Sequence, residues 1–442
     1  MKYLSRLIDR MPAFAKKIFV SFFLRFGSLG LQFAGSVLVA RQLGAAGFGA
    51  YGYAFTWAVL IGTVLGLGMG QLSIREVPRY LAHGDFGALR GFVQSWALGL
   101  AVSGLLAAAV IALCQAKGWL EFSIPWQLVV LAAVAHAIVL GLSALLSGFQ
   151  RILQSQFLES ILRQALFLGA LVLCLFLGVV LDTQNIFEIT LIAVLPVILL
   201  MAYILRHSMR QAMAGQSYTP QFTTIVWLSA SLPLLMTTLT TQLQTSLDTL
   251  VLGAMVDDTS LGLFRAASRG TDLVLIANGL AVQVLGPMLA RALAKDDHIE
   301  AQSLISQSAV MSAGLGLGIC AVLALFPGPY LGLFGTEFRA ATPVLWVLVA
   351  TQAVSVLCGP AALVLVMLRR EKLVLVTTLI MLAVNFGLKL LFIPLWGTIG
   401  AAYATLIAVI VLRVALMAIV VRTCGFDPTI WTPLKHRLAR GA

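Results

Sequence analysis

Apolar segments of about 20 residues recur along the whole chain, separated by short polar stretches. A helix needs about 20 apolar residues to cross the hydrocarbon core of a membrane. The pattern therefore predicts an all-α, polytopic membrane protein with about 12 transmembrane helices. The predicted spans are 18–42, 50–74, 91–115, 125–148, 160–181, 187–206, 223–256, 259–290, 303–326, 341–367, 373–393 and 396–421.

The segment before the first span has a different pattern. MKYLSRLIDRMPAFAKKIF is basic and carries apolar residues at helical spacing, namely Leu4, Leu7, Ile8 and Met11. This predicts a short amphipathic helix at residues 1–17 on the membrane surface. A cleaved signal peptide is the alternative, but the apolar stretch that follows is too long for one and contains Arg25, which favours retention.

Composition and charge agree with a membrane protein. The chain is 60% hydrophobic and 10% charged, whereas soluble domains carry about 25% charged residues. Most lysines and arginines fall on one side of the predicted spans, which places both termini in the cytoplasm. The net charge of +12 is explained by this bias and requires no nucleic-acid partner. The five cysteines form no CxxC pair, so neither a metal site nor a cofactor is predicted.

An internal repeat suggests two similar halves. LGAAGFGAYGYAF (43–55) and VDDTSLGLFRAAS (256–268) align with one constant separation, close to half the chain, which pairs Gly49 with Gly262, Tyr51 with Phe264 and Ala54 with Ala267. Two six-helix bundles around a central cavity are the usual architecture of a secondary transporter. The predicted boundaries are 18–210 for the first bundle, 211–222 for a cytoplasmic linker, 223–421 for the second bundle and 422–442 for a basic cytoplasmic tail.

One predicted span carries three charges on one face. Arg265, Arg269 and Asp272 are separated by four and three residues, which aligns them along a helix. A charge at the centre of a span costs about 2.5–3.5 kcal/mol, so these side chains should face protein or water. Guanidinium groups match phosphate oxygens, which favours a cationic cavity for a diphosphate. In the alternative, Arg265 extends to the membrane surface and Asp272 only neutralises Arg269.

Further charges fall within predicted spans. Arg25 and Lys389 are candidate substrate-binding cations or interface anchors, and Arg413 is expected to be an anchor. Asp248 either forms a structural pair with Arg265 or couples transport to an ion. The cations outnumber the carboxylates, which suits an anionic substrate better than a cationic drug. The candidates for substrate binding are thus Arg25, Arg265, Arg269 and Lys389, and those for a coupling or structural ion pair are Asp248 and Asp272.

Four segments, in order, carry a resemblance to a known family. They are LVARQLGAAGFGAYGYAFTW (38–57) with GLGMGQLSIREVPRYLAHGD (66–85), LDTLVLGAMVDDTSLGLFRAASR (247–269), LFGTEFRAATPVLWVL (333–348) and VNFGLKLLFIPLWGTIGAAYAT (384–405). The chain resembles the polysaccharide transporter branch of the multidrug/oligosaccharidyl-lipid/polysaccharide exporter superfamily, which includes the O-antigen flippases.

The resemblance implies a flippase for undecaprenyl-diphosphate-linked oligosaccharide in a bacterial inner membrane, working by alternating access in O-antigen, capsule or exopolysaccharide synthesis. It also implies a proton or sodium ion as coupling partner and polysaccharide polymerase machinery as a neighbour. One alternative is a drug/cation exporter of the same superfamily, which would favour carboxylates in its cavity. The other is a membrane-embedded glycan polymerase, which would need a long outer loop. HExxH, GxSxG and P-loop motifs are absent, so no enzyme is predicted.

Overall fold

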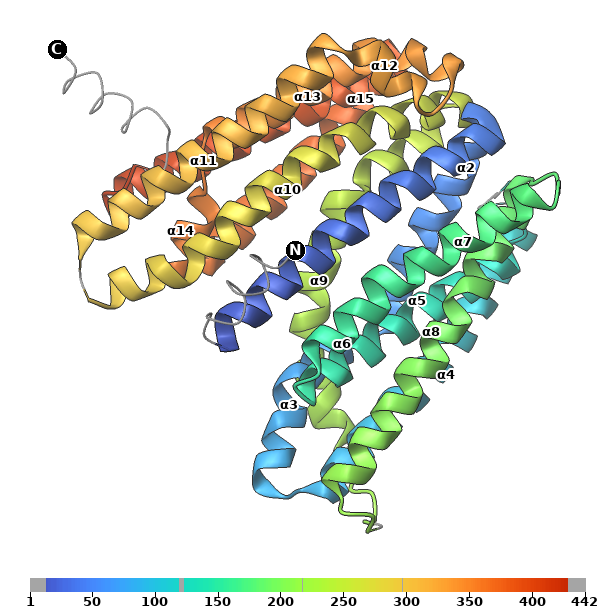
Figure 1. The fold of residues 1–442 in the computed structure, drawn as a ribbon, viewed down its shortest axis with the longest axis vertical. Coiled ribbons are helices and arrows are strands. Elements are labelled where there is room, and N and C mark those ends of the chain that lie inside the picture. Colours follow the sequence, from blue (N-terminus) through green and yellow to red (C-terminus); the bar gives the residue numbers. More distant parts are fainter. Residues whose placement is uncertain (1–12, 119–122, 217, 296, 428–442) are drawn as a thin grey trace, which may run out of the picture. The chain divides into compact units, whose positions relative to one another are not determined.

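The structure is a computed structural model that describes residues 13–118, 123–216, 218–295 and 297–427 (Figure 1). The predicted surface helix at 1–17 and basic tail at 422–442 lie mostly outside these residues. The predicted all-α fold is confirmed, since the described residues form helices and contain no strand. The helices are α2 (Ala13–Leu65), α3 (Met69–His83), α4 (Phe86–Ala116), α5 (Trp126–Gly148), α6 (Ile152–Gln156), η1 (Phe157–Leu162), α7 (Arg163–Phe176), α8 (Thr183–Ala212), α9 (Thr224–Met255), α10 (Asp258–Ala294), α11 (His298–Leu325), α12 (Pro327–Gly332), η2 (Thr336–Ala341), α13 (Thr342–Leu357), α14 (Ala361–Met367) and α15 (Glu371–Cys424).

Two of these helices, α2 and α15, each contain two helical arms joined at a glycine. Gly44 in α2 has φ 66° and Gly397 in α15 has φ 59°, both in the left-handed region that favours glycine. A Cβ added at Gly400 would lie 2.2 Å from the carbonyl oxygen of Phe392, although residues eight apart in a straight helix are about 12 Å apart. The chain of α15 therefore reverses its direction at Gly397.

The helices account for the predicted number of spans. Among the described residues, nine helices are long and apolar enough to cross a membrane. Two of the nine, α2 and α15, provide two arms each, and the 37-residue helix α10 adds another candidate. The result agrees with about 12 spans, and the protein is a multi-pass membrane protein.

Two predicted spans are interrupted. The span predicted at 50–74 breaks after Leu65, where Leu67 and Gly68 have positive φ, and α3 continues it from Met69. A Cβ at Gly68 would lie 2.3 Å from the carbonyl oxygen of Ser231, so the break lets α9 approach the chain closely. The span predicted at 341–367 breaks in the same way between α13 and α14. Hydropathy did not reveal either break because the residues on both sides are apolar.

The chain forms two compact units. Unit 1 contains the described residues up to Leu43 together with Ala50–Ser246, and unit 2 contains Gly44–Gly49 together with the described residues from Leu247 onward. In unit 1, α5 packs against α3, α4 and α8, and in unit 2, α10 packs against α11 and α13 (Figure 1). Most of α9 thus belongs to unit 1 by its contacts. The bundle boundaries predicted from the repeat stay a prediction.

The glycines paired by the repeat contact each other within unit 2. A Cβ on Gly49 would lie 1.9 Å from the carbonyl oxygen of Asp258, and a Cβ on Gly262 would lie 1.9 Å from that of Ala45. The two backbones cross so closely that neither position has room for a methyl group. Helix α10 therefore lies directly against segment 44–49.

This crossing predicts the effect of single methyl groups. We expect Gly49→Ala and Gly262→Ala each to destabilise the protein by at least the 1–3 kcal/mol typical of overpacking, since backbone must move. The thermal unfolding midpoint in detergent measures the effect. Gly314→Ala on α11 is the matched control, because a Cβ there meets nothing within 4 Å. Midpoints for the Gly49 and Gly262 variants equal to that of the control would contradict the crossing.

Candidate functional site

The charged stripe predicted from the sequence lies on α10. Asp257 caps this helix by accepting hydrogen bonds from the Ser260 backbone N–H (3.1 Å) and hydroxyl (2.7 Å). These hydrogen bonds hold the pKa of the Asp257 carboxyl below its usual value. The cap fixes the start of α10, which then presents Arg265, Arg269 and Asp272 on successive turns.

Arg265 is the buried member of the stripe. Its side chain is tied to unit 2: Nη1 donates to the Thr249 hydroxyl (3.3 Å), and the guanidinium carbon lies 5.7 Å from the centre of the Phe48 ring. An aromatic face attracts a cation at this distance. The residue is 8% exposed, so Arg265 does not extend to the surface of unit 2.

Arg269 and Asp272 form the accessible part of the stripe. Nη1 of Arg269 donates to Oδ2 of Asp272 at 3.3 Å, and the two side chains are 33% and 46% exposed. The pairing expected in the structural alternative is therefore present. A half-exposed ion pair can exchange its partner at small cost, so Arg269 is also available to a ligand anion.

Asp248 pairs with Lys389, which corrects the expected pair with Arg265. Lys389 lies on the first arm of α15, is fully buried, and donates to Oδ1 of Asp248. The hydroxyl of Thr405, on the second arm, lies 3.3 Å from the same oxygen. The chain reversal at Gly397 brings both arms to Asp248, and the sequence held no signal for that proximity.

Arg25 and Arg413, which the sequence also places inside predicted spans, have different positions. Arg25 lies on α2, but its side chain falls outside the described residues. Arg413, expected to anchor the protein at the membrane interface, instead donates to the Ser355 hydroxyl on α13. Its guanidinium thus points into the packing of unit 2.

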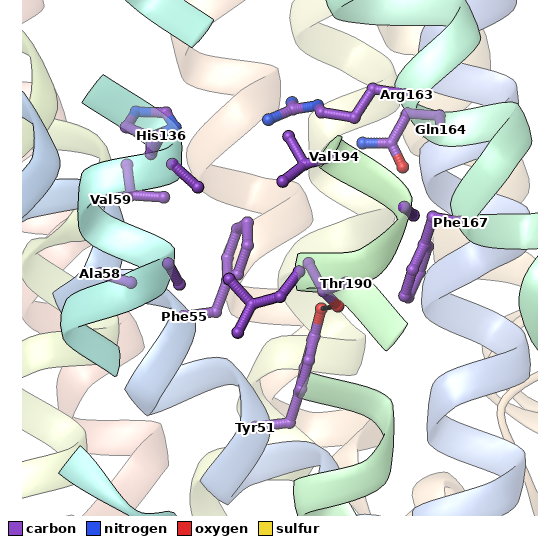
Figure 2. Close-up of a pocket in the computed structure, with 14 residues that line it drawn as sticks. Tyr51, Phe55, Ala58, Val59, His136, Arg163, Gln164, Phe167, Thr190 and Val194 are labelled. Carbon is purple, nitrogen blue, oxygen red and sulfur yellow. Dashed lines mark hydrogen bonds between the residues drawn. The ribbon is translucent and has the colours of Figure 1, made fainter. Parts of the chain in front are cut away.

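Unit 1 contains a cavity, lined by both polar and apolar side chains, that the sequence did not indicate (Figure 2). Arg163 falls near the start of the predicted span 160–181 and was not among the candidate residues. It begins α7 and lines this cavity together with His136 of α5. The π-helical turn Phe157–Leu162 directly precedes it, and such turns occur frequently at functional sites. Among the described residues, no cluster of His, Cys, Asp and Glu could hold a metal ion.

The fold matches solved structures of transporters. An inward-facing multidrug resistance MATE family transporter of the MOP superfamily has 15% identity and a TM-score of 0.70, covering 90% of this chain and 96% of its own. The lipid II flippase MurJ, in an inward closed conformation, has 17% identity and a TM-score of 0.65, covering 91% and 87%. A MOP superfamily transporter from Pyrococcus furiosus, described as having a binding pocket of reverse polarity, has 14% identity and a TM-score of 0.59, covering 91% and 94%.

These likenesses define the class of the protein as a helical membrane protein with the fold of MOP superfamily transporters. Within that class, the chain belongs to the family of polysaccharide biosynthesis proteins, which it matches over residues 14–293. The resemblance derived from the sequence motifs is thereby confirmed. No curated protein matches the chain.

The Lys389–Asp248 pair yields a stability prediction. Lys389→Met leaves Asp248 without its cation, and breaking a buried pair in this way typically costs about 3–5 kcal/mol. The double variant Lys389→Met, Asp248→Leu removes both charges and should recover most of that loss. Thermal unfolding of both single variants and the double variant gives the coupling between the sites. Additive losses would show that the two groups do not interact.

Proposed function

We propose that the protein is a flippase that moves undecaprenyl-diphosphate-linked oligosaccharide across the bacterial inner membrane for the synthesis of surface polysaccharide. The family match links the chain to polysaccharide biosynthesis. The fold of MOP superfamily transporters, which MurJ shares, supports transport by alternating access. The observation that carries the substrate class is the arginine stripe on α10.

The stripe suits a diphosphate headgroup. Arg269 lies further from the start of α10 than Arg265 does, and it is the more exposed of the two arginines. Its partner Asp272 is also partly exposed. An incoming diphosphate offers several oxygens to the guanidinium fork, so it can displace one carboxylate contact. Arg265 is held close by and adds a second positive charge. In the proposal these two arginines bind the headgroup, and Arg25 stays a candidate from the sequence.

The buried pair has a different role in the proposal. Lys389 has no exposed surface and cannot meet substrate where it stands. Asp248 is its counter-ion and also accepts a hydrogen bond from the Thr405 hydroxyl. We therefore assign this pair to the structure of unit 2, or to coupling with a proton or sodium ion that would compete with Lys389 for Asp248.

Transport is tested with fluorescent undecaprenyl-diphosphate-oligosaccharide in proteoliposomes, with and without a pH gradient. We expect flipping by the wild type and unchanged product length. Flipping that requires the gradient would support proton coupling. Elongated product would indicate a glycan polymerase instead. Export of cationic dyes without flipping would favour a drug exporter and reject the proposed substrate.

Arg269→Lys should lower the flipping rate at least tenfold, because lysine keeps the charge that neutralises Asp272 but lacks the bidentate fork. Membrane abundance and unfolding midpoint should stay near wild type. Arg291→Lys, an exposed arginine on the same helix, is the matched control and should flip normally. Equal rates for the two variants would remove Arg269 from the binding site.

Exchanging the pair, Arg269→Asp with Asp272→Arg, separates structure from binding. The ion pair survives, so folding should be retained, but the cation moves by about one helical turn. We expect transport to stay well below wild type. Full activity of the exchanged variant would mean that the pair is structural and that the diphosphate binds elsewhere.

The proposed orientation places both termini in the cytoplasm. In a background without the native cysteines, Asp182→Cys and Asp258→Cys should react with a membrane-impermeant maleimide on intact cells. Glu371→Cys should react only after permeabilisation. The reverse pattern would invert the protein in the membrane, and with it the side from which the stripe takes its ligand.

A further inference from the structure

The cavity of unit 1 lies between α2, α5, α7 and α8. None of the residues that line it belongs to the α10 stripe. Figure 2 shows Arg163 extending from α7 into this cavity and His136 lying along its α5 wall. Tyr51 and Thr190, whose hydroxyls lie 3.2 Å apart, mark the other end. The remaining lining residues are apolar apart from Gln164.

The charge of this cavity is positive. Among the described residues that line it, Arg163 is the one with a formal charge at neutral pH, and none is a carboxylate. Glu159, within electrostatic range of Arg163, is instead engaged by the Ser143 hydroxyl on α5. His136 is within electrostatic range of Arg163 as well, and its ring supplies an N–H donor.

Arg163 is not satisfied by the protein around it. Its Nε atom is fully covered and has no hydrogen-bond partner among the described residues. Leaving a buried charged donor without a partner is costly, so native structures rarely retain one without a reason. An anion bound in the cavity would offer an acceptor to the part of the guanidinium that faces the cavity, and would add to the partial neutralisation of Arg163 by Glu159.

The size of the cavity limits what the anion can be. Its volume is about 80 Å³, and about 10–15 Å³ of such space is needed to hold one water molecule. A small inorganic anion with a few waters fits. A whole diphosphate-linked sugar is larger than this space, which is open on one side. The wall near His136 is also tightly packed, since a Cβ on Gly62 would lie 2.5 Å from the carbonyl oxygen of Ala133.

We propose that unit 1 contains a binding site for a small inorganic anion of the chloride class, held by the Arg163 guanidinium and the His136 imidazole. The site is distinct from the diphosphate site proposed on α10 and does not depend on that function. A bound anion would neutralise Arg163 and strengthen the packing of α7 against α8, which the cavity interrupts.

The test uses the purified full-length protein in detergent, with sodium chloride, sodium bromide or sodium gluconate at equal ionic strength. A ligand that binds only the folded state raises the unfolding midpoint with concentration. We expect chloride and bromide to raise it on the order of 1–2 °C for each tenfold increase in concentration above the dissociation constant. Gluconate is too large for the cavity and should have no such effect.

Arg163→Gln should abolish the chloride-dependent increment even if removal of a buried charge raises the midpoint in gluconate. Arg163→Lys should keep a weaker increment, because the charge remains. Arg151→Gln is the matched control from the same unit: this arginine donates to Gln154 and Gln211 near the surface and should leave the increment unchanged. An increment that persists in Arg163→Gln would be a general salt effect and would overturn the proposal.

Two further outcomes decide the matter independently of stability. Crystals grown in bromide should show an anomalous peak within hydrogen-bonding distance of Arg163 and His136, and none in Arg163→Gln. Absence of the peak in the wild type would reject the site. An Arg163-dependent increment from inorganic pyrophosphate but not from chloride would also reject it, because the cavity would then serve the diphosphate. Neither result alters the flipping assay, so this proposal and the proposed function can fail separately.

Discussion

The backbone crossing at Gly49 and Gly262 is the constraint on which unit 2 depends. With only hydrogen at each Cα, segment 44–49 and the start of α10 approach to backbone contact, and this approach places Phe48 against the guanidinium of Arg265. Close approach through small residues is the main way in which membrane helices gain packing, because lipid offers no hydrophobic drive between them. The crossing therefore fixes both the position of α10 and the environment of its first arginine.

The family motifs describe this scaffold more than a substrate site. Glu337 accepts a hydrogen bond at 2.8 Å from the backbone N–H of Ala45, directly after the reversal at Gly44. Phe338 packs edge-on against Phe48, with ring centres 6.1 Å apart. Lys389, in the fourth motif, likewise donates a hydrogen bond to Asp248, in the second motif. Motifs distant in sequence thus hold one another in unit 2, which explains why they resemble a family without indicating which sugar it carries.

The sequence predicted what depends on local pattern and left out what depends on proximity. Apolar segments and their lengths gave the helical membrane fold and the approximate span number. The breaks at Gly68 and between α13 and α14 were not predicted because the residues on both sides of each break are apolar. Arg265 was the wrong partner for Asp248, because the pairing with Lys389 depends on the chain reversal at Gly397. Arg163 was missed because a basic residue at the edge of an apolar run looks like part of a loop, and only the packing of α5, α7 and α8 shows it facing a cavity.

The cations that remain inside the helices illustrate three ways of tolerating a charge in a medium of low dielectric constant. Lys389 is neutralised by a carboxylate, at the cost of desolvating both groups. Arg265 lies against an aromatic face and donates to a hydroxyl, and neither contact cancels its charge. Arg163 has a covered Nε without an acceptor and no carboxylate lining its cavity. The first arrangement is complete within the protein, whereas the second keeps a positive potential that an anionic headgroup can use. In the anion site that we propose, the third is completed by an anion from outside the chain.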